Sequence, residues 1–76
     1  MPKDIGIHKA AYKGELAVVE SIIKEGTDVN VIGAGNRTAL HRAVGEGHED
    51  VVRLLISHKA NVNAVDANGR TPLLFF

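Results

Sequence analysis

Four histidines are the residues of this chain best suited to metal or acid–base chemistry: His8, His41, His48 and His58. A zinc site would need at least two of them on one face, typically as a His-x-x-x-His pair on a helix. No such pair is present, and His8 and His41 are separated by 33 positions. We therefore expect structural roles for these side chains and predict no metal site.

A glycine-rich tract, Gly33-Ala34-Gly35, is the next candidate, because glycine-rich loops can hold phosphates on their backbone amides. The tract lacks the Gly-x-Gly-x-x-Gly pattern and no Lys-Ser/Thr follows it, so a hairpin turn is the better interpretation. The spacing of the remaining polar residues suggests neither a serine–histidine–acid set nor a pair of catalytic carboxylates. We predict a non-catalytic protein with no catalytic residues and no cofactor.

The composition of the chain limits its partners. Its 76 residues are enough for one small domain without cysteine, and nine basic residues balance nine acidic ones. Binding to nucleic acid or to an anionic membrane normally requires a basic excess, so we expect neither partner. No apolar run is long enough to span a bilayer or to act as a secretion signal. We expect an intracellular, cytoplasmic protein, with a nuclear location left open.

The elements that must position these residues repeat at a spacing of 33. When the sequence is compared with itself at that offset, 12 of 43 residue pairs are identical, where about three would be expected for unrelated segments. A fixed period in this range is typical of solenoids, in which each repeat is one supersecondary unit stacked on its neighbours. Such proteins generally bind other molecules.

Each period contains a short helical pattern, a glycine, a longer helical pattern and a polar loop. In the complete unit, residues 38–44 form the short pattern, with Thr38 as a natural N-cap. Gly45 and Gly47 follow, and glycine ends helices because it adopts a positive φ without a Cβ clash. Residues 49–57 form the longer pattern, whose apolar positions predict a helix packed on more than one side.

Five motifs in a fixed order carry a family resemblance. They are Gly69-Arg70-Thr71-Pro72-Leu73, Arg37-Thr38-Ala39-Leu40-His41, Gly47-His48, Val51-Val52-Arg53-Leu54-Leu55 and Ala60-Asn61-Val62-Asn63-Ala64. They resemble the ankyrin repeat, whose unit is a β-turn followed by two antiparallel helices. The resemblance implies an all-α ankyrin-repeat solenoid of paired antiparallel helices linked by β-hairpin loops. It implies one domain over residues 1–76, with repeat one at about 4–36, repeat two at about 37–69 and a truncated third repeat at 70–76.

The resemblance also implies roles for several polar residues. His8 and His41 should bond their own turn and the adjacent loop, and Asn30 and Asn63 should bond across to the next hairpin. This asparagine is hydroxylated in some members of the family. Repeat one lacks the threonine cap, and we expect Asp4 to take its place.

The loops depart from the repeat at three positions. Asn36 and Lys59 stand where the other repeat has glycine, so we expect both in the left-handed region. Gly33 stands where repeat two has Asp66, so the first hairpin should lose a side-chain brace and be the more mobile tip.

The function implied by the resemblance is protein–protein recognition through the hairpin tips and the exposed face of the first helices. By position, the candidate partner-binding residues are Tyr12, Lys13, Ala34, Gly35, Arg37, Gly45, Glu46, Ala67, Asn68 and Arg70. Tyr12, Arg37 and Arg70 stand out because tyrosine and arginine dominate interface energetics. The alternative is that Tyr12 is ordinary surface and the two arginines are scaffold residues.

A second hypothesis is self-association through the C-terminal end. The sequence finishes with Leu73, Leu74, Phe75 and Phe76, where a repeat array should have a polar cap. We expect these residues, with Val51, Leu54, Leu55 and Ile56 beside them, to form an apolar patch. A protein that stays monomeric in sedimentation at high concentration would argue against this hypothesis.

Overall fold

The computed structural model describes residues 1–72, which form four α-helices and one 3₁₀ turn without any β-strand in that range. The elements are α1 (Gly6–Lys13), α2 (Leu16–Lys24), the turn η1 (Ala34–Asn36), α3 (Ala39–Gly45) and α4 (Glu49–Ser57). The all-α prediction is confirmed. The helix predicted at residues 49–57 has the expected bounds.

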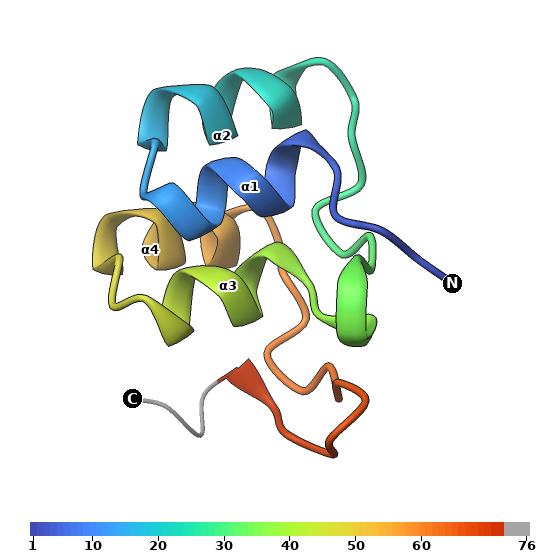
Figure 1. Cartoon of the computed structure of the whole chain (residues 1–76). Helices are drawn as coiled ribbons and strands as arrows, with labels where there is room; N and C mark the ends of the chain where they lie inside the picture. Colours follow the sequence, from blue (N-terminus) through green and yellow to red (C-terminus); the bar gives the residue numbers. More distant parts are fainter. Residues whose placement is uncertain (73–76) are drawn as a thin grey trace.

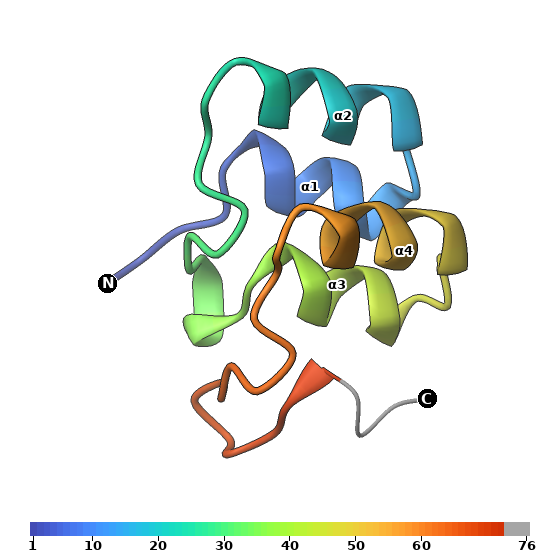
Figure 2. The same ribbon diagram turned by 180° about the vertical axis from the view of Figure 1, so that it is seen from behind.

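The helices form two antiparallel pairs stacked on each other. Helix α1 packs against α2 and α3 against α4, while α1 also packs on α3 and α2 on α4. Figure 1 shows α1 and α3 side by side, and the view from behind in Figure 2 shows α4 below α2. Both long loops leave the helices at the same end, and both short helix–helix turns lie at the other end.

Helix α3 begins as its sequence predicts. Thr38 has extended backbone angles, and its hydroxyl accepts a hydrogen bond from the His41 amide at 3.4 Å. In return, Nδ1 of His41 accepts from the Thr38 amide at 3.0 Å. Two of the amides that a helix start leaves without partners are thus satisfied, and the N-cap prediction is confirmed.

Helix α1 begins differently, and the expected Asp4 cap is wrong. The N-cap residue is Ile5, which has no capping side chain, and its amide donates to Nδ1 of His8 at 3.0 Å. Asp4 instead reaches the first hairpin loop, where Oδ1 accepts from the Ala34 amide at 3.0 Å. The histidine alone supplies the side-chain hydrogen bond at this helix start, so Asp4 is available for a contact with a distant segment.

Both non-glycine residues expected in the left-handed region are found there. Asn36 has a φ of 58° and Lys59 a φ of 69°. The glycine that ends α1, Gly14, has a φ of 76°, and the equivalent Gly47 has a φ of 73°. The loop residues therefore take the backbone conformations that the repeat pattern predicts.

The hydrophobic core is continuous across the two repeats. Its fully buried members include Ile7, Val19, Leu40, Val51 and Leu55. Val51 and Leu55 had been expected in an exposed apolar patch, and that part of the prediction is wrong because both side chains face the core. Packing of α4 on α2 as well as on α3 explains the difference.

The rest of the self-association hypothesis stays a prediction. Leu54 is partly buried and Ile56 is 41% exposed. Leu73, Leu74, Phe75 and Phe76, which carry most of the expected patch and of the third repeat, lie outside the described residues.

Candidate functional site

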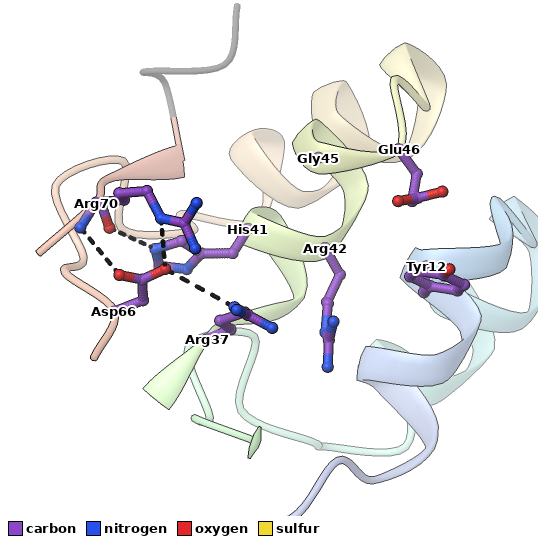
Figure 3. A pocket seen from close by; sticks show the side chains of 8 residues that line it. All are labelled: Tyr12, Arg37, His41, Arg42, Gly45, Glu46, Asp66 and Arg70. Carbon is purple, nitrogen blue, oxygen red and sulfur yellow. Dashed lines mark hydrogen bonds and ion pairs between the residues drawn. The ribbon is translucent and has the colours of Figure 1, made fainter. Parts of the chain in front are cut away.

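Helices α1 and α3, which we call the inner helices, line a pocket of about 200 Å³ together with the hairpin loops. Figure 3 shows Tyr12 on α1 at one end, the loop side chains at the other end, and Arg42 between them. The lining residues are Tyr12, Arg37, His41, Arg42, Gly45, Glu46, Asp66 and Arg70. The pocket therefore draws on both repeats and could not form from either one alone.

Asp66 organises the loop end of this pocket. Its Oδ1 accepts hydrogen bonds from the amides of Asn68 and Arg70, both at 2.9 Å. Its Oδ2 lies 3.5 Å from Nε of Arg70 and 3.8 Å from Nε of Arg37, and its side chain is only 2% exposed. The Arg70 amide, helped by the Asn68 amide and the Arg70 charge, lowers the pKa of Asp66 although burial opposes the shift.

The two arginines around Asp66 form ion pairs within the scaffold. Arg37 is the first residue of repeat two, and Arg70, 33 residues later, directly follows that repeat. Asp66 therefore pairs with the arginines on both sides of repeat two. This geometry supports the scaffold interpretation that the sequence left open. It also holds both guanidinium groups in the lining of the pocket, so the scaffold role does not prevent contact with a partner.

Arg42 lies in the middle of this pocket, between Tyr12 and the loop side chains. Its Nη2 donates to Oδ2 of Asp4 at 2.7 Å, and its guanidinium carbon lies 5.9 Å from the centre of the Tyr12 ring. A cation at this distance over an aromatic ring is attracted by the ring quadrupole. Burial raises the pKa of Asp4, but the Ala34 amide and the Arg42 guanidinium outweigh it, so the pKa is lowered overall.

A second pocket, of about 290 Å³, adjoins the first. It is lined by Asp4, Lys9, Tyr12, Lys13 and Arg42. Tyr12 and Arg42 belong to both pockets, so these two side chains form a shared wall. The two pockets make one face along α1, α3 and the hairpin loops, which we call the inner face.

The structure places six of the ten sequence-predicted residues in the two pockets of the inner face and the other four at the hairpin tips. Those lining the first pocket are Tyr12, Arg37, Gly45, Glu46 and Arg70. Lys13 lines the second pocket. Ala34, Gly35, Ala67 and Asn68 lie at the hairpin tips, where the Ala67 amide donates to the Gly35 carbonyl at 2.9 Å and joins the two tips. Their role in binding remains a proposal.

Sequence reasoning missed the central residue, Arg42, and its partner Asp4. One signal was available for Arg42: Lys9 occupies the same position in repeat one, so both repeats carry a cation directly after the repeated histidine. No local signal exists for Asp4, which lies 38 positions before Arg42.

His8 and His41 make the contacts that the resemblance implied, each with its own turn and with the adjacent loop. His8 donates from Nε2 to the Val31 carbonyl at 2.8 Å, and His41 donates from Nε2 to the Arg70 carbonyl at 3.0 Å. His48 donates to the Tyr12 carbonyl at 2.9 Å and so ties the turn after α3 to the end of α1. Within residues 1–72, no three histidine, aspartate or glutamate side chains gather as metal ligands would.

Asn30 makes the predicted link between hairpins. Its side-chain oxygen accepts from the Asn61 amide at 2.7 Å, and its nitrogen donates to the Lys59 carbonyl at 3.3 Å. The loop of repeat one is thereby bonded to the loop of repeat two.

A stack of antiparallel helix pairs, with loops joined at one end and a cupped inner face, defines a helical-repeat solenoid. The chain belongs to the ankyrin repeat family: the family model described as ankyrin repeats (3 copies) matches residues 7–75. The chain is similar to the crystal structure of the human ASB11 ankyrin repeat domain, with 32% identity and a TM-score of 0.89. That match covers 95% of this chain and 33% of the other, so the chain spans about a third of that structure's length.

No curated protein matches the sequence significantly. Ankyrin repeats are generally protein–protein interaction modules and are typically non-catalytic. In the part of the chain that the structure describes, no helix has the length and apolar character needed to cross a membrane.

Proposed function

We propose that this protein binds a partner protein through its inner face, without catalysing a reaction. The observation that carries the proposal is the shared wall of Tyr12 and Arg42, with Arg37 and Arg70 beside it in the same pocket. Tyrosine and arginine are the residue types most often found at the energetic centres of interfaces.

The side chains of this face are held in place before any partner arrives. Asp66 holds Arg37 and Arg70, and Asp4 holds Arg42 against Tyr12. Ordering long side chains on binding costs about 0.5–1.5 kcal/mol each, so a face whose arginines are already ordered avoids part of that cost. The pre-ordered arginines favour a binding role over ordinary surface.

The test is affinity capture of partners with the wild type and with a Tyr12→Ala, Arg37→Ala double variant. The matched control is Glu20→Ala with Arg53→Ala, which changes two exposed side chains on the outer helices α2 and α4. We expect the inner-face variant to lose captured proteins that wild type and control both retain, while thermal melting shows all three folded. Equal retention by the inner-face variant would contradict the proposal.

A further inference from the structure

Charge is distributed unevenly between the inner face and the rest of the molecule. The two pockets are lined by five cationic residues, Lys9, Lys13, Arg37, Arg42 and Arg70, and by three acidic ones, Asp4, Glu46 and Asp66. The whole chain is neutral, so this face has a surplus of two positive charges and the remainder an equal negative surplus. A concave surface with one sign of charge concentrates its field and attracts partners of the opposite sign.

The surplus is located in the second pocket. There Lys9, Lys13 and Arg42 face a single carboxylate, Asp4. In the first pocket, by contrast, Asp66 and Glu46 offset much of the charge of three arginines. The second pocket is therefore the part of the inner face where an additional negative group gains most.

Arg42 can accept a second carboxylate. A guanidinium has five N–H donors: on Arg42 the Nε donor is buried without a hydrogen bond and one Nη2 donor is used on Asp4, which leaves three on the terminal nitrogens of a side chain that is 20% exposed. Asp4 shows how a carboxylate sits on this group, at 2.7 Å from Nη2. Beside it, the Tyr12 ring is half exposed and offers an apolar contact.

We propose that the second pocket binds an acidic segment of a partner protein. A glutamate or aspartate carboxylate of that segment pairs with Arg42 and Lys13, and an apolar neighbour packs on Tyr12. The hydrogen bond from Arg42 to Asp4 keeps the guanidinium in place, but the negative charge of Asp4 repels the incoming carboxylate and so weakens binding. This inference rests on the proposed function and adds to it the chemistry of the partner.

The probe is a fluorescein-labelled peptide of alternating glutamate and serine with a central leucine, and its binding is followed by fluorescence anisotropy. We expect it to bind, and the same peptide with lysine in place of glutamate not to bind. Lys13→Gln and Arg42→Gln should each weaken binding about fivefold, as expected for a partly exposed ion pair. Lys24→Gln and Arg53→Gln remove the same charge at exposed outer sites and should change affinity less than about twofold.

Asp4→Asn supplies a change of opposite sign. It removes the negative charge that repels the incoming carboxylate and should tighten binding of the acidic peptide about threefold, whereas Glu20→Gln, with the same change in net charge, should leave it within about twofold. Because Arg42→Gln removes the hydrogen bond to Asp4, and Asp4→Asn alters the contacts of Asp4 with Arg42 and the first hairpin, their melting temperatures are measured alongside. Lys13 is an exposed surface residue, so Lys13→Gln provides an independent test.

Three results would overturn this inference. They are equal losses in the pocket and outer variants, equal binding of the lysine peptide, and tighter binding of a single-stranded oligonucleotide with the same number of negative charges. The proposed function is tested separately: if the Tyr12→Ala, Arg37→Ala variant loses partners while the acidic peptide fails to bind, only the acidic character of the partner is wrong.

Discussion

The two hairpin loops share a backbone hydrogen bond but are braced in different ways. In both, the amide of the first tip residue donates to the carbonyl four positions on: Gly33 to Arg37 at 2.8 Å and Asp66 to Arg70 at 3.0 Å. The second loop is braced by its own Asp66 side chain. The first is braced by Asp4, which comes from the segment before α1.

The missing side chain of Gly33 makes this exchange possible. A Cβ at position 33 would lie 2.9 Å from ring atoms of His8 and closer still to Oδ1 of Asp4. The Asp4 carboxylate therefore stands where a side chain from position 33 would begin. One hairpin thus takes from a distant segment the contact that the other makes with its own side chain, and the Asp4 carboxylate that supplies it also reaches Arg42.

The largest loss of stability is expected at one of the two glycines that follow the inner helices. Gly14 and Gly47 have nearly the same positive φ, but a Cβ on Gly14 would lie 2.7 Å from Nδ1 of His48, whereas one on Gly47 would meet nothing within 4 Å. We expect Gly14→Ala to destabilise by about 3 kcal/mol and Gly47→Ala by about 1–2 kcal/mol. Chemical denaturation measures both. Equal costs would mean that the His48 ring does not pack on Gly14.

The next prediction tests whether an aspartate at position 33 and the Asp4 contact exclude each other in the first hairpin. Gly33→Asp makes the first tip match the second, yet we expect it to destabilise by about 2 kcal/mol, because the new side chain meets Asp4 and His8. Adding Asp4→Ala should recover part of that loss, since it frees the space. A double-mutant cycle measures the coupling. A stabilising Gly33→Asp would show that the two braces are not alternatives.

The pH dependence of stability compares the two carboxylates directly. Asp4 and Asp66 both have a lowered pKa in the folded protein, so their stabilisation is complete above about pH 4, the usual value for aspartate, and is lost as pH falls through the lower folded pKa. We expect the melting temperature to fall below that pH. The fall should be shallower in Asp4→Asn and in Asp66→Asn. A variant that falls as steeply as wild type would rule out the corresponding brace.

The smallest effect is expected at the loop position after the outer helices. Lys59 has a φ of 69°, and Gly26 occupies the equivalent place with a φ of 101°. We expect Lys59→Gly to stabilise by less than about 1 kcal/mol, because it removes the strain of a left-handed side chain, and Gly26→Lys to destabilise by a similar amount. Thermal melting of both variants checks the pair. A lower melting temperature for Lys59→Gly would contradict this assignment.

Much of the fold follows from local signals that can be recognised in the sequence. The Thr38 cap, the acidic start of α4 and the left-handed sites at Asn36 and Lys59 depend on backbone preferences of residues close together in the chain. In the candidate site, the sequence predicted only the residues at positions that the repeat pattern leaves exposed, such as Tyr12. The Asp4 cap failed because the His8 ring already bonds the Ile5 amide and a distant loop offers Asp4 another donor.

The period, the helices, the turns and the family could be predicted from the sequence, because their signals lie within one 33-residue unit and its immediate neighbours. Which polar groups meet between segments far apart in the chain is settled by the packing of the repeats and their loops: Asp4 with Arg42, Arg42 with Tyr12, and Asp66 with Arg37. Ion pairs and ring contacts depend on distances of a few ångströms between side chains, and stacking the repeats sets those distances.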